Sequence, residues 1–177
     1  MWNRGYNMKK QLKNNSGYSL VELIIVIAII AILSGLAAFT LSAIKSAKAT
    51  AALQNFDTEL SALATRTRAQ SGDNAIMLTR DGDDYKVYYG TSSDGTEAKW
   101  SQTSTKAELT MVDVDIYYNE PGQTASLLTG NKIIKFKKAD GTVVTGAGLY
   151  EFKKGGTQDA VGRVTLNAST GSHYFGK

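Results

Sequence analysis

The hydrophobic pattern of the chain changes abruptly near its start. Residues 1–17 are polar and basic, whereas residues 23–33 are apolar at every position. A helix rises about 1.5 Å per residue, so about 20 apolar residues cross the hydrocarbon core of a bilayer. No soluble domain of this size needs a helix that is apolar on every face. The pattern predicts a leader at residues 1–17 and a membrane-spanning helix at residues 18–42.

Beyond this segment the apolar positions narrow to a single stripe. They are spaced three, four and three residues apart: Leu53, Phe56, Leu60 and Leu63. This spacing places them on one face of an amphipathic helix. No proline interrupts the pattern, and Ser71-Gly72 ends it. We therefore expect residues 43–71 to continue the same helix, which would run from about residue 19 to residue 70 over roughly 75 Å.

Residues 72–177 have the composition of β structure. β-branched and aromatic residues recur in short runs between Gly-rich and Asp-rich turns. Strands are predicted at residues 84–89, 108–118, 132–138, 142–144, 149–153, 163–166 and 173–175. Ala139-Asp140-Gly141 is a hairpin signal. A long helix followed by strands predicts an α+β fold, in which a C-terminal antiparallel β-sheet packs on the amphipathic half of the helix.

The net charge of +4 belongs to the leader. Four of the 20 basic residues lie before residue 18, so the rest of the chain carries 16 basic and 16 acidic residues. Basic residues before an apolar helix keep its start on the cytoplasmic side. The charge therefore predicts a single-pass protein of the cytoplasmic membrane with an exported head at residues 72–177. A neutral head does not favour a nucleic-acid partner.

The composition leaves little material for catalysis. The chain has no cysteine and one histidine, His173. This excludes disulfides, thiolate metal sites and a thiol nucleophile, and it disfavours zinc or triad chemistry. We expect no enzymatic activity, no cofactor and no metal, and a structural role for His173.

Lysines gather in the last third of the chain and have two interpretations. The set comprises Lys132, Lys135, Lys137, Lys138, Lys153 and Lys154. Lysines on solvated strand edges block edge-to-edge aggregation, which is the favoured interpretation. The alternative is a DNA contact, as a pseudopilin that takes up DNA during competence would need.

Glu22 is the one charged residue between residues 18 and 39. A carboxylate at the centre of a membrane helix costs on the order of 2.5–3.5 kcal/mol, and less near the helix end. A plain membrane anchor has no use for such a residue. Glu22 therefore predicts a function and a partner of opposite charge.

Residues 16–23 read Ser-Gly-Tyr-Ser-Leu-Val-Glu-Leu. With the basic leader and the apolar run, they resemble the processing motif of type IV prepilins and type II secretion pseudopilins. The resemblance implies that a prepilin peptidase/methyltransferase cleaves after Gly17 and N-methylates Tyr18, where the family usually has Phe. It further implies that Glu22 pairs with the N-terminal ammonium of a neighbouring pilin subunit in a helical filament. Translation starts at Met1 or Met8.

The last third of the chain also resembles the head of H-type minor pseudopilins. The resemblance consists of an apolar-x-Phe strand ending at Phe136, the Asp140-Gly141 turn, the Gly162-Arg-Val strand and the Thr170-Gly171 turn. It favours a minor subunit over a major one. Whether the filament serves a pilus, a secretion system or DNA uptake stays open.

The apolar segment has two other interpretations besides a pilin helix. A secretory signal peptide would be cleaved after the apolar run, near residues 36–38, and would release a soluble domain. An uncleaved signal anchor would hold an unrelated exported domain in the membrane. Neither explains Gly17 or Glu22. We therefore predict a structural subunit that is processed in the membrane and then assembled into an envelope or surface filament.

Overall fold

The computed structural model describes residues 18–176, except for the side chains of Ala37 and Ala38. The predicted leader, including the cleavage residue Gly17, lies outside the described residues. The chain divides into two compact units, Met1–Thr40 and Leu41–Lys177, and each is considered by itself. The division into leader, membrane helix, amphipathic helix and head stays a prediction.

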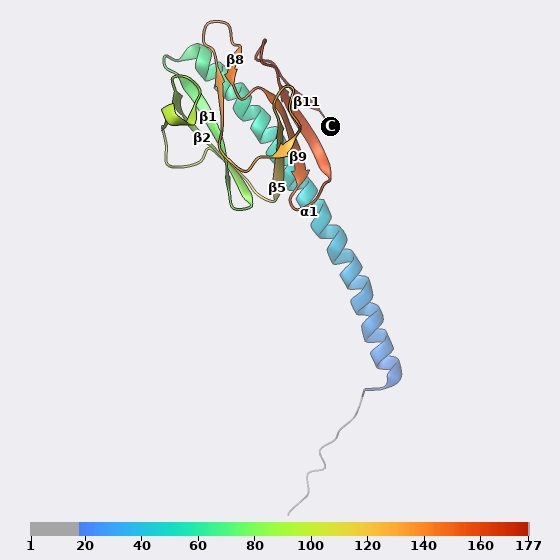
Figure 1. The fold of residues 1–177 in the computed structure, drawn as a ribbon. Coiled ribbons are helices and arrows are strands. Elements are labelled where there is room, and N and C mark those ends of the chain that lie inside the picture. The colour runs from blue at the N-terminus through green and yellow to red at the C-terminus, as the bar shows by residue number, and fades with distance from the viewer. Residues whose placement is uncertain (1–17, 177) are drawn as a thin grey trace, which may run out of the picture. The chain divides into compact units, whose positions relative to one another are not determined.

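Helix α1 extends from Leu20 to Ala69 as one α-helix of 50 residues (Figure 1). These bounds confirm the predicted helix to within a residue at each end. The helix continues through Ser34-Gly35, where an interior glycine costs about 1 kcal/mol against alanine.

The second half of α1 supplies the centre of the head's core. All four predicted stripe residues, Leu53, Phe56, Leu60 and Leu63, are 0% exposed. They form one hydrophobic cluster with residues from the strands of both sheets. The ring of Phe56 lies 5.2 Å from that of Tyr150 and 5.6 Å from that of Phe152, measured between centroids. The predicted packing of strands on the amphipathic half of the helix is confirmed.

The strands form two antiparallel sheets (Figure 1). The six-stranded sheet has the order β3-β2-β1-β7-β8, and β4 also pairs with β2. Its strands are β1 Asn74–Asp81, β2 Asp84–Ser92, β3 Trp100–Gln102, β4 Leu109–Met111, β7 Lys132–Phe136 and β8 Val143–Thr145. The five-stranded sheet has the order β11-β10-β9-β5-β6. Its strands are β5 Val114–Asn119, β6 Ser126–Leu127, β9 Gly148–Lys154, β10 Ala160–Leu166 and β11 His173–Gly176. A short 3-10 helix, η1 Glu97–Lys99, precedes β3.

The expectation of a single sheet was wrong, and the predicted strand at residues 108–118 shows why. That segment is two strands, β4 and β5, which belong to different sheets. Asp113 between them has φ 56°, in the left-handed region that non-glycine residues seldom adopt. The carbonyl of Asp113 accepts the amide of Gly155 at 2.9 Å, and its carboxylate pairs with Lys48 of α1. These contacts hold the turn at which the chain leaves one sheet for the other.

The sequence analysis also missed strand β1. It lies at the centre of the six-stranded sheet, paired with β2 on one side and β7 on the other. Gly72 precedes the strand and Asp81 ends it, and both are turn-forming residues, so the local pattern favours a loop over the whole segment. Its Ile76 and Leu78 are fully buried. The short strands β3 and β6 were missed as well, because two or three residues carry no periodicity.

The expectation that the lysine set lies on solvated strand edges was wrong for Lys135. Its side chain is 8% exposed, and its ammonium donates to Asp73 Oδ1 at 2.8 Å and to the carbonyls of Ser92 and Ser93 at 2.7 and 2.8 Å. A buried charge requires such partners. Lys135 therefore joins the segment before β1, the end of β2 and strand β7.

The other lysines of the set also have partners within the head. Lys132 and Lys153 each lie 4.0 Å from the centroid of a tyrosine ring, Lys137 pairs with Asp140 and Lys154 with Asp159, and Lys138 donates to the carbonyl of Gln70. Each of these lysines therefore has a neighbour within the protein, although Lys137 and Lys138 stay exposed to solvent.

The hairpin predicted at Ala139-Asp140-Gly141 is confirmed, because β7 pairs with β8 across it. Asp140 Oδ1 accepts the hydroxyl of Thr142 at 2.7 Å and its amide at 3.0 Å. Gly141 has φ 76° and donates its amide to the carbonyl of Lys137 at 2.8 Å. The hydrogen bonds from Thr142, with the ammonium of Lys137, lower the pKa of Asp140 from 3.8 to about 2.

Replacing Lys135 with Met will lower the free energy of unfolding by about 1–3 kcal/mol, because two strand-end carbonyls and Asp73 lose their donor. Urea unfolding of the protein in detergent micelles, followed by tryptophan fluorescence, measures the loss. Lys137→Met is the matched control, since its exposed ion pair contributes at most about 1 kcal/mol. Equal losses in the two variants would contradict the role assigned to Lys135.

Asp140 makes stability depend on pH in an acidic window. A carboxyl with a folded pKa of about 2 contributes stability that is fully present above its unfolded pKa of 3.8 and is lost as the pH falls toward 2. We expect wild type to exceed Asp140→Asn in stability at pH 5, and the difference to shrink between pH 4 and pH 2. Urea unfolding at each pH checks this. Thr142→Val, which removes the hydroxyl that donates to Asp140, should reduce this stability difference between the Asp140 and Asp140→Asn proteins. A stability difference that does not change with pH would refute the lowered pKa of Asp140.

Candidate processing and assembly segment

The first described residues form the start of α1. Tyr18 is 80% exposed and precedes the helix. Ser19 is its N-cap: its hydroxyl accepts the amide of Glu22 at 3.1 Å, and its carbonyl accepts the amide of Leu23 at 3.1 Å. The bond to the Ser19 hydroxyl engages the Glu22 amide, one of the amides that every helix start leaves without an intrahelical partner, and the bond from Leu23 is the first of the helix itself.

The sequence analysis missed this cap, although its signal was present. A serine followed three residues later by a glutamate is the capping-box pattern, and Ser19 and Glu22 have that spacing. The cap fixes Glu22 in the first turn of α1. A carboxylate there lies at the positive end of the helix macrodipole, which favours negative charge. The helix start therefore lowers the cost of a charge in an apolar segment.

The first unit of the chain presents an apolar surface on all sides of the helix. Every described side chain in residues 18–36 and 39–40 is exposed. The large apolar ones include Leu23, Ile24, Ile25, Val26, Ile27, Ile29, Ile30, Ile32, Leu33, Leu36 and Phe39, all between 46% and 77% exposed. By length and composition α1 can cross a membrane. So much exposed apolar area requires lipid or other apolar helices around it.

Two hydroxyl side chains within this apolar helix donate hydrogen bonds to carbonyls of the same helix. The hydroxyl of Ser34 donates to the carbonyl of Ile30 at 2.7 Å, and that of Thr40 donates to Leu36 at 2.9 Å. Such bonds to the preceding turn allow hydroxyls inside a membrane helix. A Cβ built on Gly35 meets no atom within 4 Å, so the side of the helix at Gly35 is open to a close neighbour.

His173 packs between strand β11 and α1. Its Nε2 lies 3.0 Å from the hydroxyl of Ser61 and 3.5 Å from Asp57 Oδ1. Triad chemistry needs the serine and the carboxylate on opposite ring nitrogens, and here both contact the same one. The contacts attach the last strand to the helix, as a structural histidine would. Among the described residues there is no group of three His, Cys, Asp or Glu that could hold a metal ion.

Comparison with known families locates the functional signal at this end of the chain. Residues 12–38 match the family model of the prokaryotic N-terminal methylation motif. The chain carries a prepilin-type N-terminal motif. This is the motif of the precursors of type IV pilins and pseudopilins, and the predicted resemblance is confirmed over these residues. No curated protein and no solved structure matches the chain.

The prepilin motif accounts for the exposed apolar surface of the helix. Precursors with this motif are substrates of prepilin peptidase, are anchored in the membrane by the apolar helix and assemble with other pilin subunits. The α+β fold, with a long N-terminal helix and antiparallel sheets, agrees with a pilin-like protein. The motif indicates a structural subunit rather than an enzyme.

Proposed function

We propose that the protein is a structural subunit of a type IV pilus or pseudopilus filament, cleaved after Gly17 and N-methylated at Tyr18. The prepilin motif at residues 12–38 is the observation on which this proposal depends. It is supported by the position of Tyr18, which is exposed and precedes the first turn of α1. A peptide bond in that position is accessible to a peptidase, whereas a bond inside the helix is not.

Glu22 is the proposed assembly residue. Cleavage after Gly17 would create an ammonium at Tyr18, and the cap of Ser19 holds Glu22 one helical turn away from that terminus. When apolar helices of neighbouring subunits pack together, an unpaired carboxylate among them is costly. Pairing with a neighbour's Tyr18 ammonium removes that cost and sets the register between subunits.

The membrane topology follows from charge and hydrophobicity. The four basic residues before residue 18 favour a cytoplasmic leader, and the head on the far side of a single span is then exported. The protein would wait in the cytoplasmic membrane until it is extracted into the filament. Its likeness to H-type heads, which ends at Thr170-Gly171, favours a minor subunit. The equal numbers of basic and acidic residues after the leader favour this structural function over DNA uptake.

Mass spectrometry of the N-terminus tests the proposal on protein recovered from cells with their own processing peptidase. We expect a terminus at Tyr18 that is one methyl group heavier than the unmodified residue. A terminus at Met1 or Met8 would identify an uncleaved anchor, and one near Ala38 would identify a secreted soluble domain. Either result would withdraw the filament proposal.

Replacing Glu22 with Ala should leave cleavage intact and lower the amount of protein that enters filaments by tenfold or more, which corresponds to about 1.4 kcal/mol of lost pairing. Immunoblots of sheared filaments and of membranes measure the two fractions. Ser19→Ala is the matched control, because it weakens the helix start but keeps the carboxylate. If Glu22→Ala enters filaments at the wild-type level, or if Ser19→Ala fails equally, the pairing does not direct assembly.

A further inference from the structure

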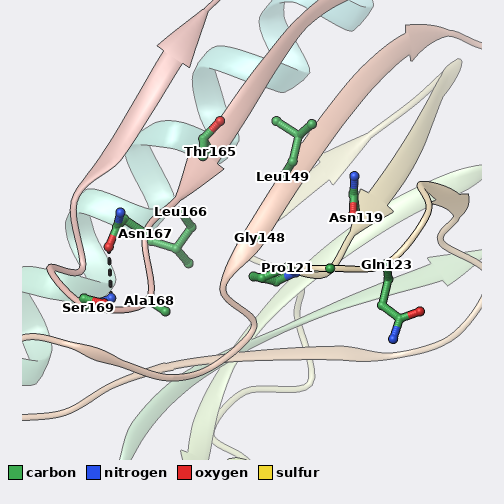
Figure 2. A pocket seen from close by; sticks show the side chains of 11 residues that line it. Asn119, Pro121, Gln123, Gly148, Leu149, Thr165, Leu166, Asn167, Ala168 and Ser169 are labelled. Atoms are coloured by element: carbon green, nitrogen blue, oxygen red, sulfur yellow. Dashed lines mark hydrogen bonds between the residues drawn. The ribbon is translucent and has the colours of Figure 1, made fainter.

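A groove of about 440 Å³ lies at one end of the five-stranded sheet, far from the prepilin motif in the sequence (Figure 2). It is bordered by the end of β5, the loop at residues 120–125, the start of β9, the end of β10 and the turn that follows it. All eleven residues that line the groove are uncharged, although charged residues make up 20% of the chain. The lining of the groove is therefore poorer in charged residues than the chain as a whole.

The groove opens on the face of the sheet that points away from the core. Directly paired residues of antiparallel strands point to the same face. The pairs Asn119↔Leu149, Leu149↔Thr165 and Thr165↔Tyr174 therefore place one residue from each of four strands in a single row. Tyr118 and Tyr150, neighbours of Asn119 and Leu149 along the strands, are buried on the opposite face. Asn119, Leu149 and Thr165 of this row line the groove, and the row continues beyond it to Tyr174.

Polar groups along the groove are available to a ligand. Within the described part of the chain, the side chains of Asn119, Gln123 and Thr165 make no hydrogen bond. Asn167 Oδ1 accepts the amide of Ser169 at 2.9 Å, the dashed line in Figure 2, which holds the turn and leaves the Asn167 amide nitrogen available. Side-chain amides and hydroxyls offer both donors and acceptors at fixed positions.

Apolar surface accompanies these polar groups. Leu149 is half-buried in the floor, and Pro121 and Ala168 lie on opposite sides of the groove. Tyr174, at the end of the row, is 61% exposed and presents its ring to solvent. Within the groove itself, Leu149 beside the amides combines an apolar surface with hydrogen-bonding groups.

We propose that this groove binds a neutral mono- or disaccharide. Sugar hydroxyls donate and accept hydrogen bonds as the amides and hydroxyls of the groove do, and the C–H face of a sugar ring packs on Leu149. The absence of charged lining residues disfavours acidic ligands. Both edges of β9 and of β10 are already paired, so an extended peptide cannot add to either of these two strands. The proposal goes beyond filament assembly and does not depend on it.

Saturation-transfer NMR with the full-length protein in nanodiscs tests the proposal. The probes are lactose, maltose, chitobiose and methyl mannoside, with glucuronate as an acidic comparison. We expect at least one neutral sugar to bind and glucuronate to bind at least tenfold more weakly. Absence of binding by all four neutral sugars, or equal binding of glucuronate, would overturn the proposal.

Matched variants locate the binding. Asn119→Ala and Gln123→Ala should each weaken the affinity by about tenfold, the loss expected for one good hydrogen bond to a ligand. Gln54→Ala, an exposed glutamine on α1, should leave it unchanged. Tyr174 lies outside the groove lining, so Tyr174→Ala should also leave the affinity unchanged.

Thermal unfolding of each variant checks that the head remains folded. Unchanged affinity in the folded Asn119→Ala and Gln123→Ala proteins would overturn the assignment to this groove. So would binding of an extended neutral peptide in preference to the sugars. A sugar-binding defect with normal filament assembly would separate this site from the assembly function.

Discussion

The burial of one stripe of α1 is the constraint on which the rest of the head depends. The stripe residues are fully buried and share one core with strands of both sheets. Phe56 packs against two rings of β9, while Glu59 accepts the hydroxyl of Tyr89 from β2 at 2.9 Å. The helix packs against strands of both sheets, so the loss of either sheet would expose the core.

The same helix has a different task in its first half. There every described side chain is exposed, and the apolar surface runs all round the helix. Such a surface is stable only in lipid or against similar helices. The prepilin motif is consistent with both environments, because it is typical of proteins that are inserted in a membrane and then assembled into a filament. The capped start at Ser19 then places Glu22, the one charge of that segment, at the end of the helix where a new terminus would form.

Several lysines form ion pairs with carboxylates of the same protein. Lys135 is enclosed by Asp73 and two carbonyls, and Lys48 of α1 reaches the strained turn at Asp113. Pairing of this kind attaches strand ends and turns to one another. It also leaves one region of the five-stranded sheet free of charge, the groove between Asn119 and Ser169, where neutral ligands meet unpaired amides.

Local patterns in the sequence determined the helix, the motif and the hairpin at Asp140-Gly141, because periodicity, capping spacing and turn residues act over a few neighbouring positions. They also determined which face of α1 would be buried. Only the tertiary structure decided that there are two sheets, that residues 108–118 divide between them at Asp113, and that Lys135 is buried. These outcomes depend on partners far along the chain: Gly155 for the turn at Asp113, and Asp73 and Ser92 for Lys135. The groove has the same origin, since it is lined by residues from three strands, β5, β9 and β10, whose adjacency no local pattern encodes.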